Sequence, residues 1–234
     1  WGLRATLIAA GLTTAAAALV FATVRIPPHA AVTRGRGSYR ELLTERPILL
    51  AAGLMVATIG GMMLGWVLAP NYLQDVHGIS LERIGWLGSI AALGSTLLSL
   101  GVSRIRWLGD PFNTLLIATA AVAGGFTLLL LGSDFRIFLV AYLLRGGFLV
   151  AWSAFYAVFG LVTREHLRSR VFALAEILGG LGTTVAPFLA GPLYELDARL
   201  PLALGLGWSV LLVIATRTVR NIIAQRQSAA VPVR

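Results

Sequence analysis

The sequence contains no cysteine and no lysine, and only 12% of its 234 residues are charged. The missing cysteine excludes disulfide bonds, thiolate metal sites and cysteine catalysis, and the missing lysine excludes a retinal Schiff base. The three histidines, His29, His77 and His166, are scattered among the connections between apolar segments. We therefore predict neither a metal site nor a cofactor. A soluble domain carries about 25% charged residues, so the shortage of charge points away from a soluble protein.

Apolar residues are in excess, at 57% of the chain, with a mean hydropathy of +0.83. Seven segments carry one charge or none, and each approaches the roughly 20 residues that cross a bilayer as a helix. They are 5–24, 47–74, 84–103, 111–133, 137–163, 171–194 and 200–216. None alternates with period two, as the strands of a membrane barrel do. The sequence therefore predicts an all-α membrane protein with seven transmembrane helices.

All 19 basic residues are arginines, and they are divided unevenly between the two sets of connections. Fourteen lie in 25–46, 104–106, 164–170 and the segment after 216, whereas only four lie in the alternate connections. Basic residues are enriched in the loops that stay in the cytoplasm. We therefore predict a multi-pass protein of the plasma or inner membrane whose C-terminus is cytoplasmic. Arginines placed between apolar runs do not indicate a nucleic-acid surface.

One arginine, Arg145, stands inside an otherwise uncharged segment. An ionisable group at membrane depth is costly, so it is a functional hypothesis by default. Tyr142, Trp152 and Tyr156 share a helical face with it. An arginine flanked by aromatic residues suits an anionic or amphipathic solute, so these four residues are predicted to bind substrate or to couple transport. The alternative is a structural arginine bonded to backbone carbonyls or to a neighbouring carboxylate.

Glu176 is the corresponding charge in the next apolar segment. Desolvation disfavours a charged carboxylate in lipid, so Glu176 is a candidate proton carrier. Two other roles remain open. Glu176 could form an ion pair with Arg168 or Arg170 at the end of its own segment, or it could pair with Arg145 across the membrane.

Small residues recur at every fourth position in the second and sixth segments. The stripes are Gly53, Ala57, Gly61, Gly65 and Ala69, and Ala175, Gly179, Thr183, Pro187 and Gly191. Such stripes let helix backbones approach closely in lipid. Static packing and a surface that moves during alternating access are both open here. The residues singled out for packing or gating are Gly61, Gly65, Gly179, Gly180, Arg168 and Arg170.

Several stretches are similar to those of one known family. Residues 68–80 resemble the loop after the family's seventh helix, and 142–147 resemble the start of its tenth. Residues 168–174, 179–182 and 191–194 resemble its tenth-to-eleventh loop and its eleventh helix. Taken in order, these features resemble the Major Facilitator Superfamily, from the sixth helix to the twelfth, over almost the whole chain.

The resemblance implies six plus six helices, with each half built from inverted three-helix repeats. Residues 1–25 would then be the last helix of an N-terminal half, 26–46 a cytoplasmic linker with a short amphipathic helix, and 47–220 the six-helix C-terminal half. Residues 221–234 would form a cytoplasmic tail. Because the chain starts at Trp1 without a methionine, we expect a fragment that lacks the N-terminal half.

One loop departs from the family's pattern. The family's cytoplasmic loop between paired helices often reads Gly, then Asp-Arg, then Gly-Arg-Arg. The corresponding stretch here runs from Gly101 to Asp110, and counting back from Gly109 the acidic position holds Arg106. The departure speaks against a gating latch on this side and leaves the fold prediction unchanged.

We expect part of a secondary active or facilitative transporter that moves a small solute by alternating access. Proton-coupled efflux by antiport is the finer expectation. The expected partners are the solute, the lipid bilayer and the N-terminal half of the same polypeptide, with no nucleic acid and no catalytic residue. The alternative is a seven-helix receptor or sensor without transport activity. An intramembrane hydrolase is disfavoured because all three histidines lie in connections.

Overall fold

The structure, a computed structural model, describes residues 3–23 and 39–229. Every element in that part of the chain is a helix, and the chain divides into two compact units, 1–36 and 37–234. The first unit contains α1 (Leu3–Thr23), whose apolar stretch is Gly11–Val20. This helix covers the first of the seven apolar segments that the sequence defines.

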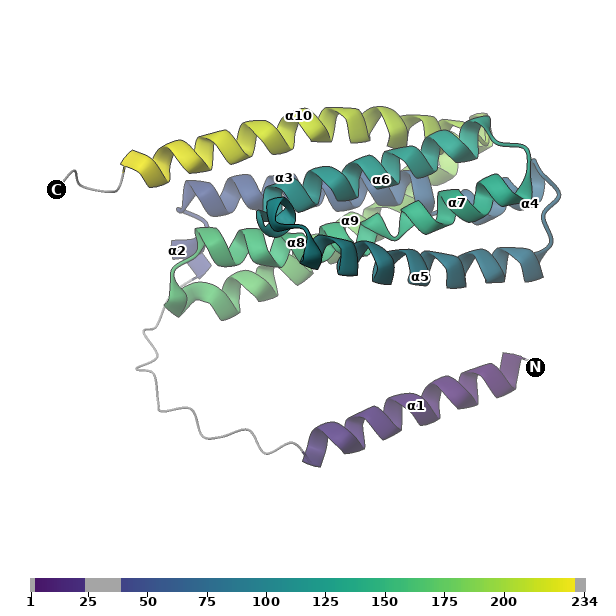
Figure 1. The fold of residues 1–234 in the computed structure, drawn as a ribbon, viewed down its shortest axis with the longest axis horizontal. Helices are drawn as coiled ribbons and strands as arrows, with labels where there is room; N and C mark the ends of the chain where they lie inside the picture. The colour runs from purple at the N-terminus through teal and green to yellow at the C-terminus, as the bar shows by residue number, and fades with distance from the viewer. Residues whose placement is uncertain (1–2, 24–38, 230–234) are drawn as a thin grey trace. The chain divides into compact units, whose positions relative to one another are not determined.

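The second unit holds the remaining helices, which Figure 1 colours by their order along the chain. They are α2 (Tyr39–Leu42), α3 (Arg46–Trp66), α4 (Ala69–Asp75), α5 (Leu81–Arg104), η1 (Arg106–Gly109), α6 (Pro111–Leu131), α7 (Phe135–Arg145), α8 (Gly147–Val162), η2 (Glu165–Leu167), α9 (Arg168–Leu196) and α10 (Leu200–Ala229). Six stretches are long and apolar enough to cross a membrane: Arg46–Asp75, Leu81–Arg104, Pro111–Leu131, Phe135–Val162, Glu165–Leu196 and Leu200–Gln225. They confirm the last six predicted spans.

Helix starts follow the capping chemistry of the sequence. The Ser80 hydroxyl accepts a hydrogen bond from the Arg83 amide (3.4 Å) at the start of α5. The Asp110 carboxylate accepts one from the Phe112 amide (2.9 Å) at the start of α6. These side chains satisfy amides that have no partner within the helix, and serine and aspartate are residue types that favour this position in a sequence. The sequence Ser38-Tyr39-Arg40-Glu41 has the pattern of a capping box, but Ser38 lies outside the described residues.

Two spans that the sequence suggests to be continuous are broken in the structure. The first breaks between α3 and α4, just before Pro70, where proline cannot donate a helical hydrogen bond. The second breaks at Gly146, between α7 and α8. At Gly146 the chain comes so close to α5 that a Cβ atom would overlap the backbone of Gly94 and Ser95. The second break therefore coincides with a close helix crossing.

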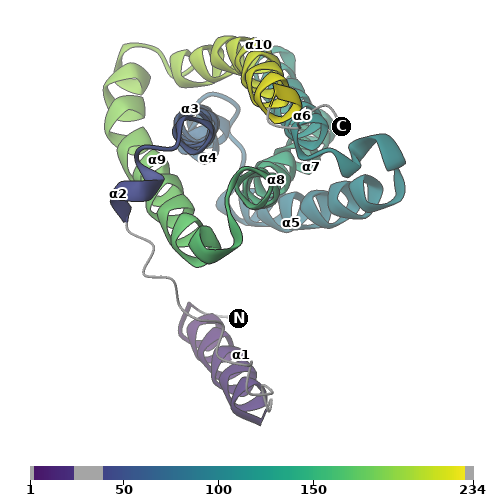
Figure 2. The ribbon, with the colours of Figure 1, turned by 90° about the vertical axis from the view of Figure 1, so that its left-hand side faces the viewer.

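The six spans form two groups of three, best seen along their axes in Figure 2. In this unit α3 packs on α9 and α10, while the α7–α8 span packs on α5 and α6. The third members of the groups, α6 and α10, pack on each other, and so do α3 and α8. The same contacts result when α3 is exchanged with the α7–α8 span, α5 with α9, and α6 with α10. Because two spans lie between equivalent helices in the chain, each helix runs opposite to its counterpart, which is the expected inverted three-plus-three arrangement.

Glycines hold the spans close together. The Gly60 and Gly182 backbones meet where α3 crosses α9, and a Cβ at Gly60 would lie 3.7 Å from the Gly182 Cα. A Cβ at Gly205 of α10 would lie 3.0 Å from the Gly65 Cα of α3. On α5, a Cβ at Gly94 would overlap the Leu143 carbonyl. In lipid, where helix association gains little from the hydrophobic effect, such close packing supplies dispersion energy instead.

The last helix is longer than its apolar segment. α10 continues to Ala229, beyond the predicted domain boundary at residue 220. No glycine or proline lies between Arg220 and Ala229, so nothing in the sequence stops the helix there. Part of the segment predicted as a tail is therefore a helical extension of the bundle.

Candidate functional site

Arg145 is the last residue of α7 and is half-buried. Its guanidinium carbon lies 5.4 Å from the centre of the Trp66 ring and 5.5 Å from that of Tyr142. The two rings are themselves in edge contact, with centroids 5.4 Å apart. A guanidinium over aromatic faces is attracted by about 2 kcal/mol once water is removed. Arg145 is thus held by π faces of two different spans.

The broken spans bring these side chains together. Trp66 is the last residue of α3, directly before the break toward α4, and Arg145 directly precedes the break toward α8. These two spans, α3–α4 and α7–α8, are equivalent to each other in the two three-helix groups. In transporters with internal repeats, interrupted helices at corresponding positions indicate the binding site. The Trp66–Tyr142–Arg145 cluster lies at that place.

Arg145 has no anionic partner. Within the described part of the chain its side chain forms neither an ion pair nor a hydrogen bond. The structural alternative, a bond to a carbonyl or a carboxylate, is therefore not what is observed. A charge at the centre of a spanning helix costs about 2.5–3.5 kcal/mol on insertion scales. The two rings offset part of this cost, and the unpaired positive charge favours an incoming anion.

The same cluster holds two polar atoms without partners. The Trp66 indole nitrogen and the Tyr142 hydroxyl are buried, with side chains 2% and 1% exposed, and neither finds a hydrogen-bond partner among the described residues. Leaving a buried donor unpaired costs about 1–3 kcal/mol. Both unpaired groups belong to the rings that Arg145 contacts.

Glu176 is bonded to Tyr156, whose hydroxyl donates to its carboxylate. The Tyr156 ring also packs on Phe172, with centroids 5.5 Å apart. Glu176 forms no ion pair with Arg145, Arg168 or Arg170 in the described structure. The partner of this carboxylate is therefore a neutral hydroxyl and not an arginine.

One family model, that of the Major Facilitator Superfamily, matches residues 50–230. The chain belongs to the Major Facilitator Superfamily. No curated protein matches the sequence. The protein is therefore a multi-pass membrane transporter of the major facilitator type, and the receptor alternative is not retained. The family is one of transporters, which are generally not enzymes.

Trp152 is the third aromatic residue of the helix face that the sequence predicts around Arg145. It is half-buried on α8, and its ring packs against α9 so closely that a Cβ at Gly179 would lie 2.5 Å from it. Trp152 thus separates the two charged positions: Arg145 with Tyr142 on one side, and Glu176 with Tyr156 on the other. The sequence grouped these side chains on one face, and the structure divides them into two clusters.

The predicted packing glycines have different surroundings. Gly61 faces the Trp208 ring, whose indole nitrogen donates to the Ala57 carbonyl (2.8 Å). Gly65 faces Phe126. At Gly180, by contrast, no described atom lies within 4 Å of a Cβ position. Close packing therefore occupies Gly61 and Gly65, whereas Gly180 faces open space on this six-helix unit.

The two predicted gating arginines lie at the start of α9. Arg168 is exposed, and Arg170 is half-buried with its guanidinium 5.9 Å above the Tyr39 ring. One Arg170 nitrogen is buried without a partner among the described residues. The loop before them is tied to the start of the unit by two ion pairs, Arg164 with Glu45 (3.6 Å) and His166 with Glu41 (3.3 Å).

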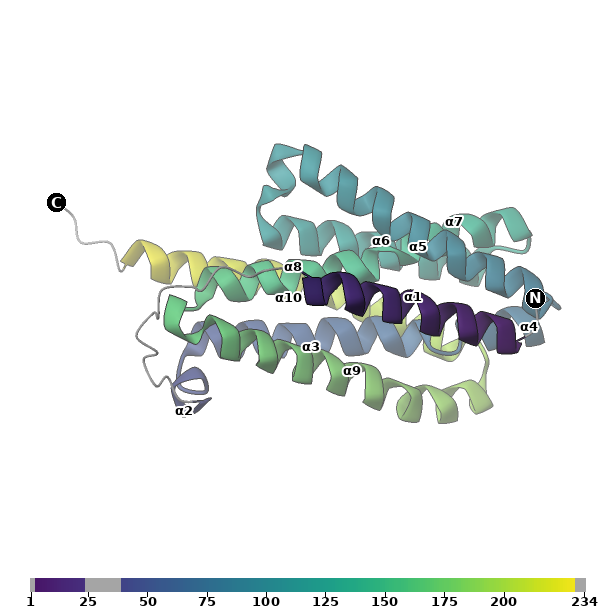
Figure 3. The same cartoon turned by 90° about the horizontal axis from the view of Figure 1, so that it is seen from below.

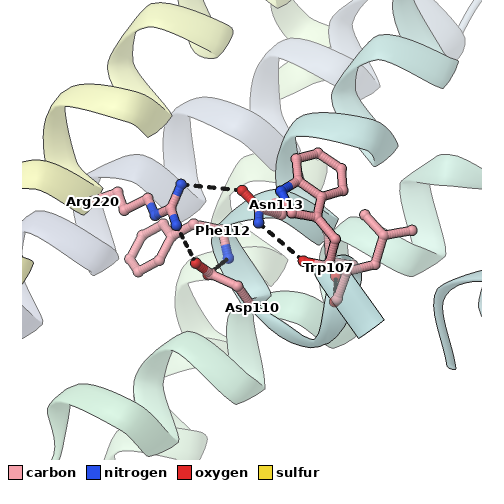
Figure 4. A network of polar contacts seen from close by, with 7 residues as sticks. Trp107, Asp110, Phe112, Asn113 and Arg220 are labelled. Carbon is pink, nitrogen blue, oxygen red and sulfur yellow. Dashed lines mark hydrogen bonds and ion pairs between the residues drawn. The ribbon is translucent and has the colours of Figure 1, made fainter. Parts of the chain in front are cut away.

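Sequence reasoning missed a polar network at the arginine-rich end, where α6 begins and α10 leaves the bundle (Figure 4). Arg220 of α10 forms a 2.6 Å ion pair with Asp110 and donates to the Asn113 side chain (3.2 Å). Asn113 in turn donates to the Trp107 carbonyl (3.0 Å). Asp110 was recognisable as a helix cap, but its distant partner left no local signal. The network joins the η1 loop to α10.

The described residues contain no group of three or more histidine, cysteine, aspartate or glutamate side chains that would hold a metal. The side chains of the two clusters described above carry arginine, carboxylate, phenol and indole groups. Such groups bind and release solutes or protons.

Proposed function

We propose that this facilitator moves a small organic anion, or an amphipathic molecule with an anionic group, by alternating access. The observation that supports this function best is the position of Arg145, a charge at membrane depth with aromatic neighbours and no anion. By helix rise, it lies about 14 Å along α7 from Arg136 near the end of the span. A planar guanidinium binds a carboxylate or phosphate through two parallel hydrogen bonds.

The solute would supply the hydrogen-bond acceptors that these side chains lack. Its anionic group would accept from Arg145 and from the unpaired donors of Trp66 and Tyr142. An apolar or aromatic part of the solute would stack on the same rings. Because these interactions gain strength in a water-poor site, a few contacts suffice for selection of charge.

Alternating access requires a second six-helix unit, which we propose to be the N-terminal half of the same polypeptide. α5 and α9 would meet it, while the site lies between the halves. The excess of arginine in one set of connections supports a cytoplasmic C-terminus. Efflux in exchange for protons is the direction that we propose.

Glu176 would be the proton carrier of this exchange. Its hydrogen bond comes from a neutral hydroxyl, so the carboxylate gains and loses a proton without breaking an ion pair. Proton binding at Glu176 and anion binding at Arg145 would occur on opposite sides of Trp152. This separation permits the two sites to be loaded in turn.

Flux measurements on the full-length protein in proteoliposomes test the proposal. With a panel of radiolabelled organic anions, Arg145→Ala is expected to reduce uptake about 100-fold, the loss of a charge-assisted contact. Arg145→Lys is expected to retain part of the uptake, because the positive charge stays and the contacts of the planar guanidinium are lost. The matched control is Arg136→Ala, an exposed arginine on the same helix. Undiminished anion flux in Arg145→Ala contradicts the proposal.

A further inference from the structure

A cavity of about 620 Å³ opens at the arginine-rich end, between α5, α8 and the η1 loop. It is separate from the Arg145 cluster, because different faces of the α7–α8 span line the two. Its walls combine small, apolar and hydroxyl side chains with one arginine. They include Val102, Ser103, Arg106, Val150, Ser153 and Ala154.

The path of α5 creates this space. Near its middle, α5 touches the α7–α8 span through the backbones around Gly94 and Gly146. Beyond this crossing, α5 diverges from α8 as both approach the arginine-rich end (Figure 3). The facing residues of α8, such as Ser153 and Ala157, are small and do not fill the gap. The result is a wedge that widens toward the η1 loop.

The mouth of the wedge carries uncompensated positive charge. Arg106 lines it, and Arg104 ends α5 two residues earlier. Neither side chain forms an ion pair or hydrogen bond within the described part of the chain. The carboxylate of this loop, Asp110, is already bound by Arg220 at 2.6 Å (Figure 4). The network thus removes the one loop anion that would compete for Arg106.

The η1 loop has the composition of a membrane interface. Ile105 and Trp107 are 51% and 59% exposed on either side of Arg106. Exposed tryptophan at the end of a span sits at the level of lipid headgroups. The backbone beneath them is fixed, since Thr114 donates to the Leu108 carbonyl at 2.7 Å. A rigid loop with apolar side chains and free arginines therefore borders the cavity at headgroup level.

We propose that the wedge binds an anionic phospholipid, with one acyl chain between α5 and α8 and the phosphate on Arg106 and Arg104. Basic pockets between transmembrane helices at the cytoplasmic side suit such headgroups. The substitution of Arg106 for the acidic residue expected in this loop fits this ligand, because a carboxylate there would repel the phosphate. Charge complementarity selects the headgroup, and the apolar walls select the chain.

Native mass spectrometry of the full-length protein in detergent tests the inference. Phosphatidylglycerol and phosphatidylcholine with identical chains are titrated separately. Wild type is expected to bind phosphatidylglycerol about tenfold more tightly, and Arg106→Ala to lose that preference, as one charge-assisted bond is removed. Ala157→Phe fills the wedge and is expected to reduce binding of both lipids. The control, Arg217→Ala, removes an exposed arginine of α10 that does not line the cavity.

Several results overturn the inference. Equal binding of the two lipids by wild type shows that no headgroup is recognised, and an unchanged preference in Arg106→Ala places the phosphate elsewhere. Glycerol 3-phosphate that displaces phosphatidylglycerol at matching concentration identifies a soluble-anion site instead. Unchanged lipid binding in Ala157→Phe excludes the wedge as the chain site. Thermal unfolding in phosphatidylcholine verifies that each variant is folded, and transport activity is not needed for any readout.

Discussion

Arg145 and Arg220 are two arginines of one six-helix unit with opposite surroundings. Arg220 holds a carboxylate at 2.6 Å and an amide oxygen at 3.2 Å, at the end where α10 leaves the bundle. Arg145 lies within a span and touches two aromatic rings at 5.4 and 5.5 Å, and no described residue supplies it with an anion. The first charge is satisfied by the protein itself. The second is held by two aromatic rings and keeps its charge available, as the proposed binding of an anionic solute requires.

The difference predicts opposite effects on stability. Arg220 stabilises the fold through partners that depend on it, so its removal leaves Asp110 and Asn113 without their bonds. Arg145 imposes a desolvation cost that its rings only partly offset. Proteins often tolerate such cost at sites selected for function. Substitutions at the two arginines should therefore change stability in opposite directions.

The largest effect is expected from Glu176→Gln, which tests the second charge of the site. Glutamine can still accept from Tyr156 but cannot carry a proton. We expect solute exchange to continue while its dependence on a proton gradient is lost entirely. The measurement is flux in proteoliposomes with and without an imposed pH difference. A proton dependence that survives in Glu176→Gln removes this residue as the carrier.

The next largest effect concerns the crossing that positions Arg145. Gly94→Val places side-chain atoms against the Leu143 carbonyl, so α5 and α7 must separate. We expect a loss of about 3 kcal/mol in unfolding free energy, typical of overpacking at a close contact. Gly88→Val on the same helix is the control, since no described atom lies within 4 Å of its Cβ position. Equal unfolding curves for the two variants would show that this crossing is not tight.

Single substitutions at Arg220 and at its partner Asp110 are expected to give a smaller effect. Asp110→Ala removes both the α6 cap and the ion pair, and should cost about 1–2 kcal/mol. Arg220→Ala should cost less, about 1 kcal/mol, because both side chains are partly exposed. Arg145→Met, in contrast, is expected to leave the unfolding free energy unchanged or to raise it. Chemical denaturation in detergent checks all three, and a destabilised Arg145→Met would refute the contrast.

The smallest effect involves His77, a titratable group in the connection between α4 and α5. Burial lowers the pKa of His77, and the positive charge of Arg199 lowers it further. Its ring packs on Phe138 at 4.8 Å and lies 3.2 Å from the Tyr72 hydroxyl. The unfolded chain therefore binds a proton more readily than the folded one.

Stability should accordingly be complete above about pH 6.5 and decline as the pH falls below that value. Thermal unfolding of wild type and His77→Gln across this range tests the sign. The glutamine variant should show a flatter profile. A wild-type stability that rises on acidification would mean that protonated His77 is favoured by the fold.

Much of this fold was predictable because membrane spans depend on composition. Apolar length located the six spans of the second unit, and the caps at Ser80 and Asp110 placed two helix starts. The breaks after Trp66 and Arg145 were not predicted. The break at Gly146 depends on the approach of α5, which a local pattern does not contain.

The site was predictable where one helix carries it. Helical spacing placed Tyr142 beside Arg145, and this neighbourhood is confirmed by their ring contact. Trp66 was missed because it comes from a different span and lies inside an uncharged apolar segment, where nothing in the sequence marks it. The Glu176–Tyr156 bond and the Asp110–Arg220 pair likewise join separate helices. Partners that depend on tertiary packing have no signature in the spacing of a single segment.

Whether Arg145 binds an anionic solute can be measured by tryptophan fluorescence, as equilibrium binding of organic acids and their uncharged amides to the full-length protein. Trp66 lies over the Arg145 guanidinium and would report a bound ligand. If Arg145 binds the anionic group, wild type should bind at least one acid about tenfold more tightly than its amide, and Arg145→Gln should abolish the difference. A preference for the amides, or an acid preference that persists in Arg145→Gln, would contradict it.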